Sequence, residues 1–570
     1  MICKKKTLLT ATALGAMTLA TSAMAERGTD GQLNLLLWQA PSTLNVYLST
    51  GTKDMLASSL ILEPLAAFAP DGEIVPRLAA EIPSMENGGI SEDMTQITWK
   101  LKEGLKWSDG SDVTAEDVKF TADYCMSEEG GCSQAAKFDA IASVEVVDPL
   151  TVTITFDSPR PYPFQAFVGS QAPILQKAQF ENCLGAAAAT CTEANFGPIG
   201  TGPFMVTDFR TNDVASFEVN PEYREADKPA FANVNLKGGG DSAAAARAVL
   251  ETGEYDYAWN IQISPETLNQ MLAAGMGKLE VEFGATTEHL KMNMTDPSPD
   301  LPEGERSTVA HPHPILSDEN VRRALSMAID RNILNEIGYG ETGAATCNMV
   351  NGPAEFAADN TDCLTQDIEG AKALLEEAGW TDEDGDGIRE KDGRKLSLLF
   401  QTSVNAVRQD FQALIKQWWQ EIGVQTELKT VDASVFFGSD PNSPDTLVKF
   451  YADVEMYTDV YDGTDPGTFL AEHACDAIPS PENQWQGENA ARFCFEEYDA
   501  MVEQMSQTSG TEARAALAQE MDLMLTRDTM VLQPLISRGR VSVSSNALAG
   551  VQMNPWDSEF WNVADWSRAE

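Results

Sequence analysis

Apolar and polar residues alternate in several short stretches of the chain, and elsewhere the apolar residues recur at helical spacing. The alternating or continuous apolar stretches predict strands at 33–38, 144–147, 151–156, 205–209, 396–400, 424–431, 447–456, 531–536 and 541–543. The helical spacing predicts helices at 55–68, 243–246, 316–331, 368–378, 407–422 and 512–525. Helices that alternate with strands indicate an α/β fold. Because one hydrophobic core does not extend over so long a chain, we expect two or three domains.

The first 25 residues have the pattern of an export signal. Lys4, Lys5 and Lys6 precede an apolar run at 8–20, and Ala23-Met24-Ala25 has the small-x-small form of a cleavage site. Cys3 precedes the apolar run, which argues against a lipid-modified cysteine at the cleavage point. No other segment approaches the roughly 20 apolar residues that span a bilayer. We therefore expect a soluble periplasmic protein that begins at Glu26.

Acidic residues dominate the charge. Without residues 1–25 the chain keeps 36 basic and 87 acidic residues, a net charge of −51. Nucleic acid and anionic membrane surfaces would be repelled by such a protein and are not expected partners. The charge is typical of a solvated acidic surface, and a pocket for cationic ligands is the alternative.

Eight cysteines remain after the signal, and they fall into neighbouring pairs. In an exported protein they predict disulfides, although eight cysteines allow about 105 pairings in principle. No pair has the Cys-x-x-Cys spacing of a zinc site. Proximity predicts Cys125–Cys132, Cys183–Cys191, Cys347–Cys363 and Cys475–Cys494.

Catalytic and nucleotide-binding motifs are missing from the sequence. The four histidines stand in no Gly-x-Ser-x-Gly or His-Glu-x-x-His context, and the glycine-rich run 196–204 lacks the Gly-Lys-Ser/Thr of a phosphate loop. An enzyme is therefore not expected.

Asp382, Asp384 and Asp386 alternate with other residues and are followed by Gly387, which is the start of a calcium loop. The seventh and ninth positions would add the carbonyl of Ile388 and the side chain of Glu390. The twelfth position is Gly393 instead of a bidentate glutamate, so the loop is irregular. Structural calcium and an acidic turn between a helix and a strand both remain open.

Several separated motifs carry a family resemblance. They are 70–79, 98–124 with Trp107, Asp109-Gly110 and Thr114-Ala115-x-Asp117-Val118, 196–204, 250–258 and 316–331. In this order they resemble the extracytoplasmic solute-binding family of peptide and nickel ABC importers. The resemblance implies an α/β, two-lobe periplasmic-binding-protein clamp with a hinge, which captures a solute between its lobes. It also implies an inner-membrane permease as partner, a monomeric state and no required cofactor.

The resemblance also implies a division of the chain. The first lobe is expected to comprise 26–68, 198–290 and 533–570, with an inserted subdomain at 69–197. The second lobe is expected at 291–532, and the Pro-rich, charged loop that follows Asn293 and runs through His313 is the expected hinge and linker.

The ligand residues are assigned through the same resemblance. Asp459 best matches the aspartate that pairs with a peptide's α-ammonium in this family, with Asp462 and Asp465 as rivals. Dipeptide binders hold an arginine where this chain has Gln401-Thr402-Ser403, so a dipeptide's carboxylate would lack a partner there. Aromatic candidates for the pocket wall, each of which has core packing as its alternative, are Tyr457, Trp259, Trp38 and Trp556.

Three functions are compatible with these observations. The first is a binding protein for a peptide-like or amine-bearing solute. The second keeps the fold but binds an oligosaccharide or opine-like ligand stacked on the tryptophans. The third is an exported enzyme or folding factor.

Overall fold

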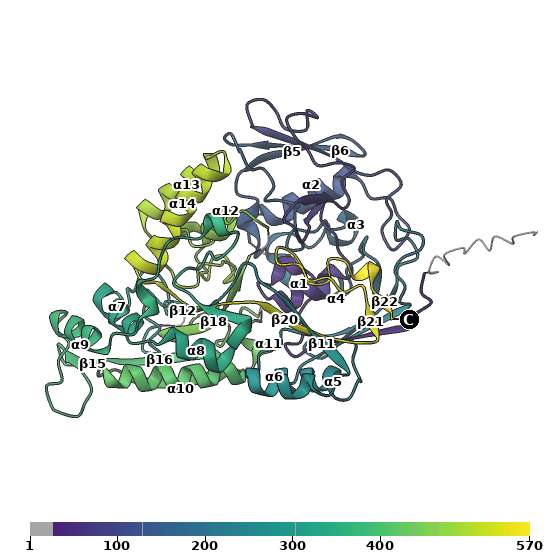
Figure 1. Cartoon of the computed structure of the whole chain (residues 1–570). Helices are drawn as coiled ribbons and strands as arrows, with labels where there is room; N and C mark the ends of the chain where they lie inside the picture. The colour runs from purple at the N-terminus through teal and green to yellow at the C-terminus, as the bar shows by residue number, and fades with distance from the viewer. Residues whose placement is uncertain are drawn as a thin grey trace, which may run out of the picture.

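The computed structural model describes residues 27–127, 129–130, 132–302, 304–438, 440–461 and 463–569. The predicted export signal, 1–25, lies outside the described residues. Two large sheets organise the chain, and Figure 1 shows them side by side. We call the part built on each sheet the first and the second lobe.

The first lobe is built on a seven-stranded mixed sheet with the order β11-β20-β10-β1-β9-β8-β7. Its strands are β1 (Gln32–Leu37), β7 (Phe204–Arg210), β8 (Val214–Val219), β9 (Asn233–Gly238), β10 (Tyr257–Trp259), β11 (Gly277–Glu282) and β20 (Arg540–Ser545). Strand β1 runs parallel to both neighbours, β9 and β10. It is largely apolar because it lies in the middle of the sheet.

The second lobe is built on a six-stranded sheet with the order β13-β19-β12-β18-β16-β17. Its strands are β12 (Thr286–Met292), β13 (Gly343–Ala345), β16 (Ser397–Ser403), β17 (Gln425–Val431), β18 (Val454–Val460) and β19 (Leu532–Arg538). Strand β12 is antiparallel to β18 and β19, and every one of its residues is buried. The sheet therefore has a covered centre.

The chain crosses between the lobes twice, between β11 and β12 and between β19 and β20. Strand β12, which was expected to end the first lobe at Leu290, pairs with strands of the second sheet. Strand β19 likewise stays in the second sheet until Arg538, and β20 joins the first sheet at Arg540. We therefore propose lobe boundaries at 283–285 and at Gly539, which also removes the loop after Asn293 from the hinge.

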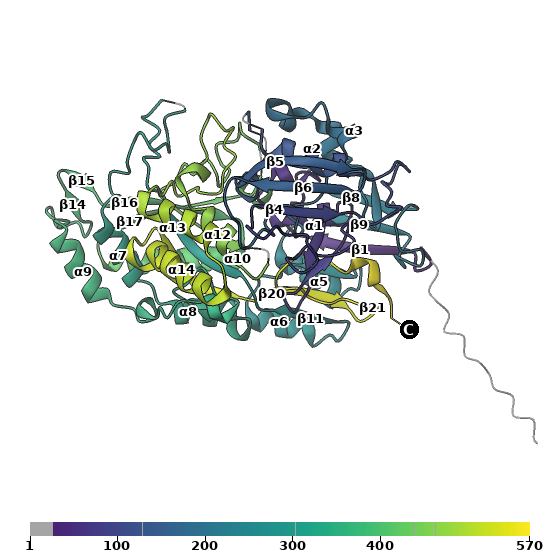
Figure 2. The ribbon, with the colours of Figure 1, turned by 90° about the horizontal axis from the view of Figure 1, so that it is seen from above.

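A third, smaller sheet in the order β4-β6-β5 lies in the region expected to be an insertion. Its strands are β4 (Gln96–Lys100), β5 (Ile141–Asp148) and β6 (Thr151–Phe156), and α2 (Ala115–Cys125) packs on β5 and β6. Figure 2 shows these elements beside the first sheet. One apolar core joins Leu35 of the first sheet with Trp99 and Val118, so the insertion belongs to the first lobe.

Further helices cover the two large sheets. In the first lobe they are α1 (Thr52–Ser59), α3 (Lys177–Phe180), α4 (Thr192–Phe196), α5 (Ser242–Leu250) and α6 (Pro265–Leu272). In the second lobe they are α7 (Glu319–Met327), α8 (Arg331–Gly338), α9 (Ile368–Glu377), α10 (Ala406–Glu421), α11 (Ala433–Phe436), α12 (Gly467–Ala471), α13 (Glu496–Gln507) and α14 (Thr511–Leu523). The remaining two-stranded pairs are β2 (Ala66–Phe68) with β3 (Ile74–Pro76), β14 (Glu390–Lys391) with β15 (Arg394–Lys395), and β21 (Leu548–Ala549) with β22 (Ser567–Arg568).

Three predicted elements differ from the structure. The helix predicted at 55–68 ends at Ser59, and its last residues form β2. The helix predicted at 316–331 is two helices, α7 and α8, because the side chains of Asp318 and Asp330 each cap a new helix start. The strand predicted at 447–456 begins at Val454 and runs to Val460, which brings its end to the space between the lobes.

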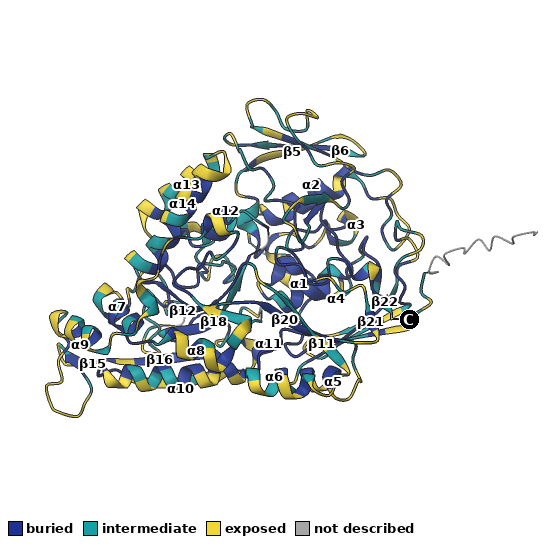
Figure 3. Ribbon diagram, viewed as in Figure 1, coloured by how far each residue is buried: buried dark blue, intermediate teal, exposed yellow. Residues whose placement is uncertain are grey.

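Burial follows the sheets: Figure 3 shows buried residues along the strands and exposed ones on the outer faces of α10, α13 and α14. The structure joins all four cysteine pairs that the sequence predicts. Within the described residues, none of the helices combines the length and the apolar character needed to cross a membrane.

Candidate functional site

A partly open cavity lies between the two lobes, and its empty space, counted together with the solvent at its mouth, is about 1110 Å³. The first lobe contributes Gln39, Thr50, Gly51, Thr52, Met55, Leu56, Gln134, Gln171, Trp259, Asn260, Arg540 and Glu559. The second lobe contributes Thr286, Arg408, Phe437, Leu447, Tyr457, Thr458, Asp459, Val460, Phe469, Glu472, Glu488 and Arg538. A cavity at this position, between two lobes, is typical of a small-molecule site.

The end of β18 places Tyr457 and Asp459 in the cavity wall. They lie opposite His289 and Thr287 of β12, and opposed residues of an antiparallel pair share a face of the sheet. The Asp459 carboxylate is 3.4 Å from His289 Nε2 and 3.5 Å from the Lys291 ammonium. Burial raises the pKa of Asp459, but the Lys291 ammonium, the strongest of its neighbours, holds that pKa below its ordinary value. Asp459 is therefore an ionised group in a poorly hydrated wall.

Two further acids, Glu472 and Glu488, line the same cavity. Burial, and then the carboxylates of Glu472 and Asp459, raise the pKa of Glu488 well above its ordinary value. The neighbouring His473 is held neutral, because burial lowers its pKa to about 3. This acidic wall can therefore accept a cation, and a cation near Glu488 would favour the loss of its proton.

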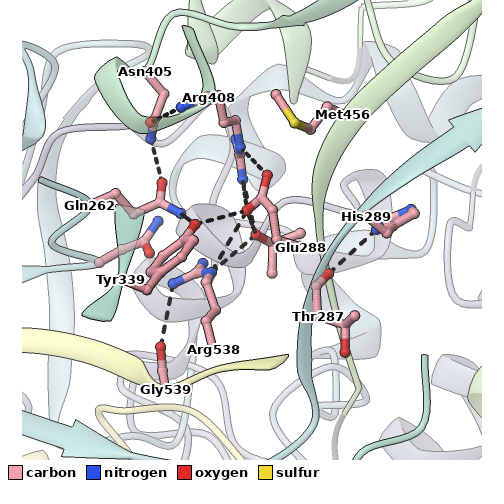
Figure 4. Close-up of polar contacts among 12 residues, drawn as sticks. Gln262, Thr287, Glu288, His289, Tyr339, Asn405, Arg408, Met456, Arg538 and Gly539 are labelled. Carbon is pink, nitrogen blue, oxygen red and sulfur yellow. Dashed lines mark hydrogen bonds and ion pairs between the residues drawn. The ribbon is translucent and has the colours of Figure 1, made fainter. Parts of the chain in front are cut away.

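Arginines form another part of the wall, and Glu288 holds two of them. Arg408 lies in the first turn of α10, where Asn405 caps the helix by accepting from the Arg408 N–H at 3.1 Å. The Arg408 guanidinium donates to the Glu288 carboxylate at 2.7 and 3.2 Å, and Arg538 lies 3.9 Å from it (Figure 4). Burial raises the pKa of Glu288, but these positive charges lower it more, so the pKa lies below its ordinary value.

The Glu288 network also connects the two lobes. Tyr339 donates to Glu288 at 3.2 Å and accepts from Gln262 Nε2 of the first lobe at 3.2 Å. Asn405 donates to Oε1 of Gln262, so this one side chain contacts two elements of the second lobe (Figure 4). The arginines are consequently fixed in place relative to both lobes.

Three of the six predicted ligand residues line the cavity: Asp459, Tyr457 and Trp259. Thr402 is fully buried, and its hydroxyl donates to the Met456 carbonyl at 2.6 Å. Trp38 lies in an apolar core of the first lobe, where Nε1 donates to the Asn260 carbonyl at 2.7 Å.

Trp556, the sixth candidate, packs against apolar cores of both lobes and is not among the lining residues. Its backbone carbonyl accepts from the Gly463 N–H at 2.6 Å. The residue therefore contacts the second lobe beside the cavity.

Asp465 and Asp462 were the alternatives to Asp459 as the residue that binds the ligand's ammonium. Asp465 forms a bidentate ion pair with Arg514, with N···O distances of 2.5 and 2.6 Å, and both side chains are more than nine-tenths buried. That carboxylate is engaged in holding α14 to the segment after β18. Asp462 lies outside the described residues.

The acidic loop at 382–390 brings carboxylate oxygens of Asp382, Asp384 and Glu390 within 4.8 Å of one another. Asp386, however, pairs with the ammonium of Lys395, which also lies 3.8 Å from Asp384 and 3.6 Å from Glu390. Asp382 accepts from the N–H groups of Gly385 and Gly387 at 2.8 and 3.1 Å. These contacts are those of an acidic turn around a lysine, and a calcium ion would compete with Lys395 for the same oxygens.

The sequence analysis missed Glu288, Arg408, Glu472, Glu488, Arg538 and Arg540. In a chain with 87 acidic residues, Glu472 and Glu488 carry no distinguishing signal. The segment Arg538-Gly539-Arg540 does carry a distinguishing signal, because its two arginines interrupt an apolar stretch that continues on both sides. Charged side chains within an apolar stretch are almost never fully buried unless they have a partner.

Residues 73–475 match the model of the bacterial extracellular solute-binding proteins, family 5. The match covers more than half of the chain, so the protein belongs to this family. The oligopeptide-binding protein AppA of Bacillus subtilis is 26% identical over 403 residues, which cover 69% of this chain and 68% of AppA. The glutathione-binding protein GsiB of Salmonella paratyphi A is 23% identical and is covered to 90%, as is this chain.

The structure of Bacillus subtilis AppA in complex with a nonapeptide superposes with a TM-score of 0.80. It covers 96% of this chain and 100% of that one, at 20% sequence identity. The likeness confirms the α/β fold with two lobes that the sequence predicts.

Proposed function

We propose that the protein is the solute-binding component of an ABC importer. In this proposal it captures a peptide-like or amine-bearing solute between its lobes in the periplasm and delivers it to an inner-membrane permease. Membership of the solute-binding family supports the general role, and the named relatives are binding proteins. The lobes would close over the solute by a hinge at the two crossings.

The acidic wall of the cavity is the observation that carries the choice of solute. Three carboxyl groups lie in one wall of the cavity, those of Asp459, Glu472 and Glu488. The ammonium closest to Asp459 is that of Lys291. A carboxylate in a poorly hydrated cavity binds a cationic amine through strong, charge-assisted hydrogen bonds. We infer that the ligand's ammonium group binds here, with Tyr457 and Trp259 as apolar neighbours.

Isothermal titration with a pool of free tripeptides and the same pool N-acetylated tests this proposal. We expect the free pool to bind roughly tenfold more tightly or better, because acetylation removes the charge. Asp459→Asn should reduce this preference, while Asp208→Asn, on the exposed part of β7, should not. Equal binding of both pools, or no binding of either, contradicts the proposal.

The alternative of stacked sugar or opine-like ligands has less support, since Trp38 and Trp556 do not line the cavity. Thermal-shift measurements with sugars and peptides separate the two: stabilisation by sugars and not by peptides would favour the alternative. The third possibility, an enzyme or folding factor, would require turnover of a ligand that is lost on mutation of a specific acid.

We further propose that Lys395, and not calcium, holds the 382–390 loop. Calcium at millimolar concentration should leave the melting temperature unchanged, because the ammonium already pairs with the loop's carboxylates. A calcium-dependent rise that Asp384→Asn abolishes would instead show a metal site.

A further inference from the structure

Arg540 is a buried cation at the cavity wall with part of its hydrogen-bonding capacity unused. It begins β20, is 7% exposed and lines the cavity. Nη1 donates to the carbonyls of Asn554, at 2.9 Å, and Asp557. Within the described residues, Nη2 has no hydrogen-bond partner, and no carboxylate lies within ion-pair distance of the guanidinium.

Several other buried arginines have partners for their guanidinium groups, although Nε of the buried Arg492 also has none within the described residues. Arg514 forms a bidentate pair with Asp465, and Arg408 forms one with Glu288. Arg331, which has no acidic partner, donates to three backbone carbonyls and a serine hydroxyl. A buried charged donor without a partner is costly, and Nη2 of Arg540 is one such donor at a residue that lines the cavity. Nη2 is itself closed to solvent, so an acceptor supplied from the cavity reaches it only after a small movement of the Arg540 side chain.

Arg538, two residues earlier, adds a second cation to the same wall. Its Nε donates to Thr458 at 3.1 Å, and its acidic neighbour Glu288 is shared with Arg408. Glu559 also lines the cavity, but it accepts hydrogen bonds from Tyr257 and Ser542. Three guanidinium groups therefore face two carboxylates in this part of the wall.

We propose that Arg540, assisted by Arg538, binds a carboxylate of the transported solute. This inference rests on the proposed function. It assigns a binding site to the negatively charged group of the ligand, as the acidic wall does to its ammonium. A guanidinium offers two parallel N–H donors that match the two oxygens of a carboxylate. The positively charged partner that is missing at Gln401-Thr402-Ser403 is thus supplied from the second crossing between the lobes.

The position of the two arginines gives this contact a second consequence. Arg538 ends β19 in the second sheet and Arg540 begins β20 in the first, with Gly539 between them. A carboxylate held by both side chains contacts the two lobes at the point where the chain crosses. Binding of the ligand's acidic group therefore stabilises one relative orientation of the lobes.

Paired probes test the assignment: a pool of tripeptides with free carboxyl termini and the same pool as carboxyl-terminal amides, both with free amines. Wild-type protein should bind the acids roughly tenfold more tightly or better, because the amide lacks the charge. Arg540→Gln should remove most of this preference, so that the variant binds the acids and the amides with similar affinity. Arg540→Lys should restore it in part, because it keeps the charge without the two parallel donors.

Arg247→Gln, on the exposed face of α5, is the matched control and should bind both pools like wild type. A far-ultraviolet circular dichroism spectrum of Arg540→Gln that matches wild type shows that the variant is folded. Equal affinity of wild type for acids and amides, or an acid preference that persists in Arg540→Gln, overturns this subsite and leaves the amine site standing. If wild type binds neither pool, the proposed function fails and this assignment fails with it.

Discussion

Glu488 connects the charge of the ligand to pH at the scale of a single residue. Because burial and the acids beside it raise its pKa in the free protein, a cationic amine bound nearby should lower that pKa. The complex then holds fewer protons than the free protein, so amine binding should release protons and tighten as the pH rises above the ordinary titration range of a glutamate. Isothermal titration in two buffers of different ionisation enthalpy measures the release.

Glu488→Gln should abolish this proton release, since the amide does not titrate. The control is Glu145→Gln on the exposed surface of β5. Proton uptake on binding, or release that is unchanged in Glu488→Gln, would show that another group carries the linkage.

Asp522 gives a prediction for stability. It is fully buried on α14, where it accepts from the Met349 N–H at 3.0 Å, and burial raises its pKa to about 7. Because this folded-state pKa lies above the value of an unfolded aspartate, folding takes up a proton between about pH 4 and pH 7. Stability from this group is therefore lost as the pH rises through that window.

Asp522→Asn keeps an acceptor for Met349 and does not titrate. Its melting temperature should fall less than that of wild type between pH 5 and pH 8, by a few degrees. Parallel curves for the two proteins would contradict the role assigned to Asp522.

Single residues were predictable where a local pattern identifies them. The eight cysteines pair by proximity, and Asp459 follows from the match to a motif. Glu288 and Arg408 were not predictable, because Glu288 on β12 and Arg408 on α10 are 120 positions apart and meet only in the folded lobe. Thr402 was predicted as a ligand residue from its position in the sequence, but its side chain in β16 is buried and does not line the cavity.

At the scale of elements, apolar patterns located the strands and helices but not every boundary. The pattern at 316–331 is continuous, yet Asp330 caps a second helix by accepting from the N–H groups of Asn332 and Ile333. A polar residue on the exposed side of one helix looks the same in sequence as the cap of the next. The end of β18 was missed for a related reason, because its last residues are polar and face the cavity.

Asp117 fixes helix α2 to its surroundings. Its carboxylate accepts from the Thr114 N–H and, at the same distance of 2.9 Å, from the Lys177 N–H that begins α3. Asp117→Ala should cost about 1–3 kcal/mol of stability in the insertion, because it removes a cap and leaves buried donors unsatisfied. Hydrogen exchange in residues 69–197 measures this loss.

Glu116→Ala is the control for Asp117→Ala. Glu116 neighbours it on α2, but its carboxylate is half-exposed and pairs with Lys177 on the surface. Surface pairs contribute little, so this variant should exchange like wild type. Equal protection in both variants would show that Asp117 does not hold the helix.

The whole molecule combines a strongly acidic surface with a cavity whose walls differ in charge. Its fold class followed from the alternation of helices and strands, whereas the crossings at 283–285 and Gly539 did not. Strands β12 and β19 mix polar and apolar residues, as β11 and β20 of the first lobe do, so nothing in the pattern marks the change of sheet.

The net charge predicts how solutes reach the cavity. The field of a protein with a formal net charge of −48 attracts cations, and added salt screens this attraction beyond about 10 Å at 0.1 M. The association rate constant of Ala-Lys-Ala should fall roughly tenfold between 10 mM and 500 mM salt, and that of Ala-Ala-Ala should change little. Stopped-flow tryptophan fluorescence measures both. The dissociation rate constants should depend only weakly on salt, because the contacts that hold the ligand lie in the closed cavity. An equal salt dependence of association for the two peptides would mean that the acidic surface has no part in capture.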